Sequence, residues 1–154
     1  MNRTFRIITI TISLVLTGSV IHADGHIDAA IKARQAQMQL YAFNLGTLGS
    51  MAKGQAEYDA TVATTAASNL AALSMLDQSL IWPKGSDSGS AKSNAKIEIW
   101  TNFPDIMNKG KAMADAALLM KAAAGGGLDS MRGAMGPLGA SCGGCHKVYK
   151  ETRN

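Results

Sequence analysis

The chain has 154 residues, of which 47% are hydrophobic, 5% aromatic and 17% charged. This length suits one domain, and the hydrophobic fraction is too high for a disordered protein. Alanine and methionine dominate the hydrophobic residues, which favours helices over a large β-sandwich. The formal net charge is +4, and no long basic run accompanies it, so the composition does not indicate nucleic-acid binding.

Residues 1–23 are typical of a secretory signal peptide. Arg3 and Arg6 supply the positive charge, residues 7–21 form a hydrophobic stretch, and Ala23 offers a cleavage point. An uncleaved membrane anchor is the alternative, but the stretch is shorter than the roughly 20 residues that span a bilayer. We therefore expect cleavage, and an exported domain of residues 24–154 that has no membrane span and lies in the bacterial periplasm.

Hydrophobic residues recur at helical spacing in four segments of the remaining chain, and no comparable two-residue alternation of a strand is present. The four series run from Ile27 to Leu48, from Val62 to Leu80, from Ile99 to Met120 and from Leu128 to Tyr149. The connections between them are short, long and short. This order predicts an all-α fold, an antiparallel up-down-up-down four-helix bundle.

The residues between the series are those expected at helix ends. Asp59 can cap the second helix, and the polar segment 82–90 predicts a loop. Three glycines at 125–127 end the third helix, and Asp129 falls in the first turn of the fourth, where a negative charge is favourable. Pro137 lies inside the fourth series, which predicts a kink there or a helix that restarts with the proline in its first turn.

The segment Cys142-Gly143-Gly144-Cys145-His146 contains both cysteines of the chain and has the spacing of a haem c attachment signature. Two thiols three residues apart on one helical face can bond to the two vinyl groups of one porphyrin, and the adjacent histidine can hold the iron. A disulfide would close too small a loop to constrain much, a thioredoxin-like pair needs a preceding strand, and structural zinc needs more ligands. We therefore expect one covalent haem c.

The position of this motif indicates the class of cytochrome. Only eight residues follow His146 and none is methionine, so a second axial ligand must come from an upstream helix. The chain resembles the class II c-type cytochromes, the cytochrome c′ group, whose four-helix bundles carry Cys-x-x-Cys-His on the last helix. The resemblance covers nearly the whole chain after residue 23 and includes Arg34-Gln35, Lys53-Gly54, Tyr58-Asp59, Ile97 to Trp100, Gly139 to Ser141 and Tyr149-Lys150.

This resemblance implies a role for each residue that matches the family pattern. It implies a haem bound within the bundle, with Cys142 and Cys145 as its thioether attachment residues and His146 as the proximal axial iron ligand. Arg34 matches an arginine that lies beside the haem propionates, and a side chain whose charged head reaches water at the bundle end is the alternative. Lys150 falls where relatives often carry arginine, so it keeps the charge but loses the planar guanidinium.

Met38 is the residue on which the predicted function depends. It lies four residues after Arg34, where family members place the side chain that faces the distal haem surface. As the sixth iron ligand it would give a six-coordinate haem suited to electron transfer. As a packing residue it would leave a five-coordinate haem open to nitric oxide or carbon monoxide, and the family contains both cases. Gln37 and Gln39 should point away, because neighbours on a helix diverge by about 100°.

We therefore expect a periplasmic haem c protein that carries single electrons to and from an unidentified redox partner, with gas binding as the alternative. An enzyme is not expected, because the motif has neither a free histidine nor paired carboxylates beside it. Lysines 92, 96, 109 and 111 form a solvated face or, as the weaker alternative, a docking surface for acidic partners. Trp82 and Trp100 are expected to anchor the core or the loop. The resemblance also implies a homodimer formed through the first two helices.

Overall fold

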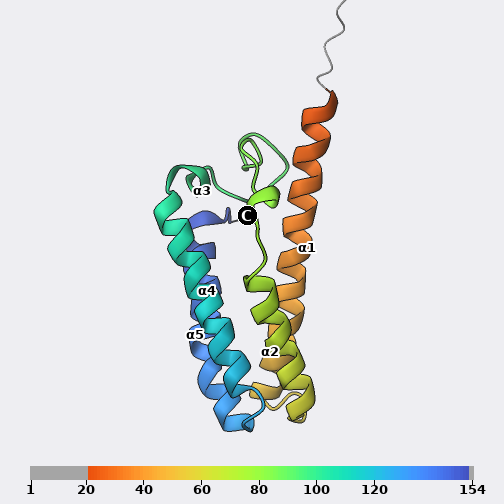
Figure 1. Ribbon diagram of the computed structural model, residues 1–154, viewed down its shortest axis with the longest axis vertical. Coiled ribbons are helices and arrows are strands. Elements are labelled where there is room, and N and C mark those ends of the chain that lie inside the picture. The colour runs from red at the N-terminus through yellow and green to blue at the C-terminus, as the bar shows by residue number, and fades with distance from the viewer. Residues whose placement is uncertain (1–20, 153–154) are drawn as a thin grey trace, which may run out of the picture.

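The structure is a computed structural model that describes residues 21–152. Four long helices alternate in direction and close into a bundle (Figure 1). They are α1 (Ile21–Ala52), α2 (Ala60–Ser74), α4 (Phe103–Ala123) and α5 (Leu128–Tyr149), and the short helices η1 (Ser79–Ile81) and α3 (Glu98–Thr101) lie between α2 and α4. The predicted all-α four-helix bundle is confirmed.

The short turns of the bundle lie where the sequence predicts them. Asp59 caps α2, since its carboxylate accepts hydrogen bonds from the backbone N–H groups of Thr61 and Val62 at 2.7 and 2.9 Å. Gly127 precedes α5 with a φ of 105°, a conformation that favours glycine. Asp129 lies in the first turn of α5, as predicted.

The second helix is shorter than its hydrophobic series predicts. It ends at Ser74 instead of continuing to Leu80, and Leu76 and Leu80 are 56% and 78% exposed. The Asp77 carboxylate accepts a hydrogen bond from the backbone N–H of Ser79 at 2.9 Å. This local turn competes with continuation of the helix and leads into η1.

The third series also contains a break that the sequence analysis missed. Ile99 lies in the single turn α3, and Asn102 then leaves the helical conformation with a φ of −119°. The long helix α4 starts at Phe103, with Pro104 in its first turn. A proline is tolerated there because its missing N–H would have no acceptor within the helix.

Pro137 lies inside α5, which is continuous from Leu128 to Tyr149. The predicted restart of the helix at this proline is therefore wrong. A proline ring opposes the carbonyl four residues earlier, which here belongs to Gly133. Gly133 and Gly136 carry no side chains, and no side chain or neighbouring element lies within 4 Å of where a Cβ would stand at either position.

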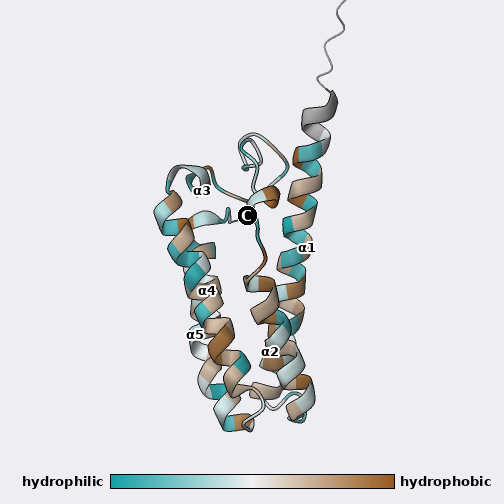
Figure 2. Ribbon diagram, in the orientation of Figure 1, coloured by the Kyte–Doolittle hydropathy of each residue, from teal (hydrophilic) through white to brown (hydrophobic). Residues whose placement is uncertain are grey.

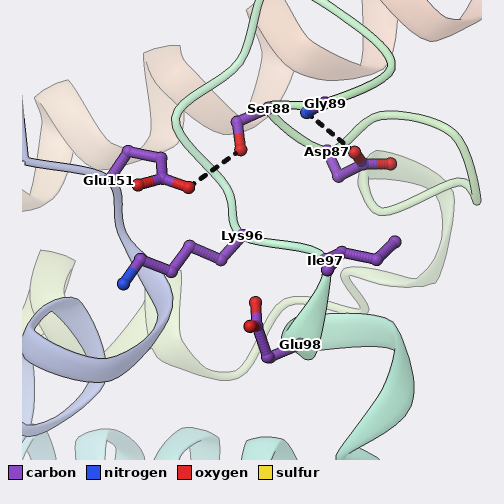
Figure 3. Close-up of a pocket in the computed structure, with 7 residues that line it drawn as sticks. All are labelled: Asp87, Ser88, Gly89, Lys96, Ile97, Glu98 and Glu151. Atoms are coloured by element: carbon purple, nitrogen blue, oxygen red, sulfur yellow. Dashed lines mark hydrogen bonds between the residues drawn. The ribbon is translucent and has the colours of Figure 1, made fainter.

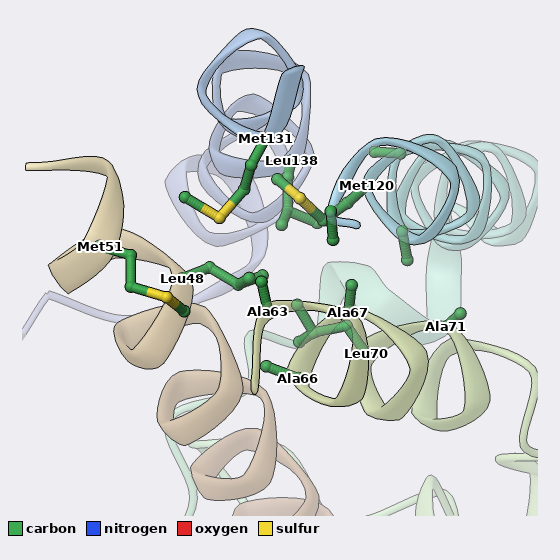
Figure 4. Packing of buried hydrophobic residues seen from close by; sticks show 13 residues of the cluster. Leu48, Met51, Ala63, Ala66, Ala67, Leu70, Ala71, Met120, Met131 and Leu138 are labelled. Carbon is green, nitrogen blue, oxygen red and sulfur yellow. The ribbon is translucent and has the colours of Figure 1, made fainter. Parts of the chain in front are cut away.

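The hydrophobic core fills one end of the bundle (Figure 4). On α5 the cluster of buried residues extends from Met131 to Leu138, and on α4 it extends from Ala116 to Ala124. Small alanines of α2 and α4 line much of it, and its fully buried large side chains are Leu48, Leu70, Met120, Met131 and Leu138. The half of α5 that carries residues 142–146 lies beyond this cluster.

The opposite end of the bundle carries the long loop between η1 and α3. This loop pairs with the end of the chain, because the Lys96 N–H donates to the Tyr149 carbonyl at 3.0 Å and the Glu151 N–H donates to the Asn94 carbonyl at 2.8 Å. The predicted loop over residues 82–90 contains no helix. The end of α5 is thus fixed against a segment more than fifty residues away in the sequence.

Residues 1–20 of the predicted signal peptide lie outside the described residues, and α1 already includes Ile21 to Ala23. Figure 2 shows that hydrophobic and hydrophilic residues are mixed along each long helix. Within residues 21–152, no helix combines the length and hydrophobicity needed to cross a bilayer.

Candidate haem site

The Cys-x-x-Cys-His motif occupies the last turns of α5, at the end of the bundle that the core cluster leaves free. Cys142 and Cys145 are partly buried, and their thiols are not joined in a disulfide. His146 is exposed, and no hydrogen bond to its ring is formed by the residues that the structure describes. All three groups are therefore available to a ligand.

The environment of the motif favours neutral forms of its histidine and of one thiol. Although the side chain is exposed, desolvation of the ring by nearby groups, together with the positive charge of Lys150, lowers the pKa of His146 below its usual 6.5. Burial raises the pKa of Cys145, although the nearby Lys109 acts in the opposite direction. An imidazole that is neutral at physiological pH can bind a metal ion through a ring nitrogen.

Met113 of α4 is a neighbour of the motif that the sequence analysis treated only as part of a hydrophobic stripe. Its sulfur lies 3.9 Å from the Cys142 sulfur and accepts a hydrogen bond from the Ser141 hydroxyl at 3.2 Å. Its helical spacing in the series from Ile99 to Met120 predicts that Met113 faces the bundle, but this spacing does not predict its contact with Cys142. The contact shows that α4 forms one side of the site.

The pairing of α1 with α5 brings Met38 level with His146. The guanidinium of Arg132 donates to the Ala52 carbonyl at 2.8 Å, and a Cβ at Gly49 would lie 3.8 Å from the methyl group of Met135. The two helices run in opposite directions, so equal steps from Gly49 and Met135 reach the same height. Eleven residues, about three turns, lead from Gly49 to Met38 and from Met135 to His146.

The same step preserves the facing sides of the two helices, because eleven residues rotate a helix by about three full turns. Tyr41 agrees with this pairing, since the nearby Cys142 contributes to the high pKa of its phenol. Burial is the main cause of that rise, to about 12. The pairing thus brings Tyr41 of α1 close to Cys142 of α5.

Met38 is 37% exposed, so it does not fill the core in this structure. The sequence analysis expected both flanking glutamines to point away from the haem surface that Met38 faces. Gln37 is only 6% exposed and bonds to α2, whereas Gln39 is exposed. The buried face of α1 is wider than a single stripe, because α2 covers one side of it and α5 covers the other.

Arg34 is almost fully buried, with 4% of its surface exposed. Its guanidinium donates to the hydroxyls of Ser86 and Ser93 at 2.6 and 2.7 Å, to the Ser86 carbonyl, and to the Ile81 carbonyl at 3.3 Å. Its charged head is therefore held by the loop and does not reach out into water. These bonds use both terminal nitrogens and leave the Nε–H without a protein acceptor among the described residues.

Two tryptophans enclose this guanidinium. Its central carbon lies 4.6 Å from the ring centre of Trp82 and 6.0 Å from that of Trp100, and the Trp100 indole N–H donates to the Trp82 carbonyl at 3.0 Å. Both tryptophans thus anchor the loop, as expected. Burial lowers the pKa of Arg34, while the nearby Asp87 acts in the opposite direction. An arginine remains charged at neutral pH despite such a shift.

A polar pocket of about 310 Å³ lies beside this loop (Figure 3). Asp87, Lys96, Glu98 and Glu151 contribute to its lining, and the Ser88 hydroxyl donates to the Glu151 carboxylate at 3.1 Å. None of the predicted haem residues lines this pocket. This pocket is therefore separate from the predicted haem residues.

The residues present fit a covalently held haem. Two free thiols and one imidazole lie on consecutive turns of α5. Over the described range, no three histidine, cysteine or acidic side chains cluster closely enough to hold a metal ion by themselves. A porphyrin supplies the remaining iron ligands from its own nitrogens. The buried Arg34 has no carboxylate within ion-pair distance among residues 21–152, and a buried cation is stabilised by an anionic partner.

Comparisons with known proteins identify the family of the chain. The Cytochrome C′ family matches residues 29–150. Cytochrome c-554 of Cereibacter sphaeroides is 43% identical over 145 residues, which cover 94% of this chain and 95% of the relative. The solved structure of cytochrome c′ from Rhodobacter sphaeroides has a TM-score of 0.80 at 32% identity and covers 82% of this chain and 98% of that one.

A second solved structure is a ferrous variant of cytochrome c′ from Alcaligenes xylosoxidans with bound NO. It has a TM-score of 0.72 at 34% identity and covers 82% of this chain and 97% of that one. The relatives that match carry the names of cytochromes, which are haem proteins not classed as enzymes.

A four-helix bundle that ends in a Cys-x-x-Cys-His motif defines a c-type haem protein of the helical-bundle class. The chain belongs to the cytochrome c′ family and binds haem c. Both the predicted family and the predicted cofactor are therefore confirmed.

Proposed function

We propose that this protein carries single electrons, with Cys142 and Cys145 holding the haem and with His146 and Met38 holding the two axial positions of its iron. The haem, when bound, supplies an iron atom that alternates between the ferric and ferrous states. The observation that carries the proposal is the helix pairing that brings Met38 level with His146. The 43% identity to a cytochrome c-554 supports the same class of function.

The side chains around the site suit this role because they keep its geometry fixed. If His146 and Met38 both held the iron, the protein around it would need to rearrange little when the iron changed its charge. Met113 of α4 and the partly buried Tyr41 of α1 border Cys142. Arg34 lies one helical turn before Met38, and its free Nε–H would suit a haem propionate.

Binding of a small gas is the second candidate function. The NO complex of the Alcaligenes protein favours it, as does the exposure of Met38, which could leave the distal face open. In that case an apolar side chain beside the iron would exclude water and admit nitric oxide or carbon monoxide. The two candidates differ in one property, the presence or absence of the methionine sulfur on the iron.

Absorption spectra of the purified holoprotein separate the two candidates. Electron carriage predicts a low-spin ferric spectrum, and a ferrous spectrum that carbon monoxide does not change on mixing. The variant Met38→Ala should then become high-spin and bind carbon monoxide. A high-spin native protein whose spectrum does not respond to Met38→Ala would instead support gas binding.

Export to the periplasm is part of the proposal. Proteins of the cytochrome c′ family are known from the periplasm, and residues 1–23 have the composition of a signal peptide. N-terminal sequencing of the protein recovered from the periplasmic fraction should begin at Asp24, and recovery from the cytoplasm alone would contradict export.

A homodimer through α1 and α2 is the third part of the proposal. The outer faces of these helices expose Leu40, Phe43 and Val62, and an apolar groove of about 280 Å³ lies between the helices near Leu73 and Leu76. Burial of such side chains against a second copy would be favourable. Light scattering should give twice the mass of one chain, and the variant Phe43→Glu should give the mass of a single chain.

A further inference from the structure

Gln37 and Gln39 flank Met38 in the sequence, but only Gln37 is buried. Its amide nitrogen donates to the Leu73 carbonyl of α2 at 3.1 Å. Leu73 lies in the last turn of α2, where the backbone carbonyls receive no hydrogen bond from a following turn of the helix. The glutamine therefore satisfies an otherwise unpaired carbonyl and joins the two helices at the level of Met38.

A second tie of the same kind lies two turns further along α1. The Asn69 amide of α2 donates to the Asn44 side-chain oxygen at 3.0 Å, and Asn44 donates to the Leu40 carbonyl at 2.8 Å. Gln37 and Asn44 are seven residues apart, so they lie on the same side of α1. Polar side chains thus attach one side of α1 to α2.

Met38 lies on the opposite flank of the buried face. Successive residues on a helix are rotated by about 100°, and Gly49, which lies on the Met38 side, approaches Met135 of α5. A rotation of α1 that released Gln37 from α2 would therefore turn Met38 relative to α5. The orientation of Met38 and the bond of Gln37 depend on the same rotation.

Gln37 is retained in this position at a cost. Its side-chain oxygen is buried and has no hydrogen-bond partner within the described part of the chain. A buried unpaired acceptor is unfavourable and offsets part of what the bond to the Leu73 carbonyl contributes to stability. The bond nevertheless fixes the rotation of α1 relative to α2.

We propose that Gln37 is a positioning residue that sets the rotation of α1 and thereby holds the Met38 sulfur toward the iron. This inference rests on the proposed function, because it requires Met38 to be an axial ligand. In this proposal the hydrogen bond of Gln37 determines whether Met38 covers the distal face of the haem or leaves it open. The Asn44–Asn69 hydrogen bond lies further from Met38, so it stabilises the packing of α1 on α2 without orienting Met38.

The test compares Gln37→Leu with two controls, Gln39→Leu on the exposed side of Met38 and Asn69→Ala, which removes the second tie. Each holoprotein is examined by its ferric spectrum, by carbon monoxide binding after reduction, and by thermal unfolding. Loss of one buried hydrogen bond predicts a roughly tenfold larger high-spin, carbon monoxide-binding fraction in Gln37→Leu. Both controls should keep the native spectra, even where Asn69→Ala lowers the melting temperature.

The outcomes separate the two proposals. A low-spin native protein with an unchanged Gln37→Leu spectrum would overturn the role of Gln37 and leave electron carriage intact. An equal rise of the high-spin fraction in Asn69→Ala would overturn it too, because general loosening would then suffice. A native protein that is high-spin and indifferent to Met38→Ala would overturn both proposals. Should Gln37→Leu not accumulate, Gln37→Asn, which shortens the donor, provides the same comparison.

Discussion

Arg34 and Ser86 lie 52 residues apart in the sequence, yet the Arg34 guanidinium donates hydrogen bonds to both the hydroxyl and the carbonyl of Ser86. With Ser93 and the two tryptophans, these bonds fasten the long loop to α1. The attachment point is one turn from Met38. The loop and the distal side of the proposed haem site are therefore fixed by one side chain.

Replacing Arg34 should release this loop. Arg34→Met removes four hydrogen bonds from a charged donor, two of them buried and two partly buried, and should lower the free energy of unfolding by about 2–4 kcal/mol. Trypsin should then cleave more rapidly after Lys84 and Lys92, both within the loop. Arg132→Met, which removes a bond at the other end of the bundle, is the control. Equal cleavage rates in both variants would contradict the role given to Arg34.

Tyr58 should stabilise the end of the bundle that holds the core. Its hydroxyl donates to the Ala124 carbonyl at 2.7 Å and accepts from the Gly127 N–H at 3.1 Å, so it joins the two short turns. Tyr58→Phe should cost about 1–2 kcal/mol in urea unfolding. The haem spectrum should not change, because these turns lie far from the motif. A stability equal to that of the native protein would show that water replaces both bonds.

The tyrosine at the end of α5 should make stability fall at high pH. The Tyr149 hydroxyl donates to the Asp105 carboxylate at 2.6 Å, and this bond is the main reason that the pKa of Tyr149 rises from about 10 to about 12. The stabilisation is complete below pH 10 and is lost as the pH rises toward 12, because the unfolded chain ionises first.

Urea unfolding between pH 9 and 12 measures this effect, with Tyr149→Phe for comparison. The native protein should lose stability more steeply over this range than the variant, which has no phenol to ionise at that position. Identical slopes would show that the Tyr149–Asp105 bond does not persist in solution.

The core and the haem site should be separable by mutation. Leu48→Ala leaves a cavity among fully buried residues and should cost about 2–5 kcal/mol. Leu119→Ala, on the exposed side of α4, should cost little. Calorimetry of the two holoproteins checks the difference, and both should keep the native absorption spectrum because the core cluster does not extend to residues 142–146. A changed spectrum in Leu48→Ala would contradict this separation.

Local sequence signals predicted the elements that depend on local chemistry. Asp59 has the side chain of an N-cap, and three consecutive glycines at 125–127 disfavour a helix, so the start of α2 and the turn between α4 and α5 were predictable. The motif of α5 identified the haem site because its spacing has a chemical meaning of its own. Met38 was assigned to the distal side from the family resemblance, and the pairing of α1 with α5 supports this assignment.

Features that depend on neighbouring helices were not predictable. The burial of Gln37 follows from the position of the α2 terminus, which hydrophobic spacing placed at Leu80 and not at Ser74. The contact of Met113 with Cys142 requires the pairing of α4 with α5. The partners of Arg34 come from a polar loop whose path has no periodic signal.

Proton NMR of the reduced holoprotein, with methionine methyl groups labelled, tests the ligation of iron by Met38 most directly. A methyl group bound through its sulfur lies over the porphyrin face, so the ring current should shift one methyl resonance far upfield, and Met38→Leu should remove that resonance alone. If every methionine methyl group resonates in the ordinary range, Met38 does not bind the iron, and single-electron carriage by a six-coordinate haem is contradicted.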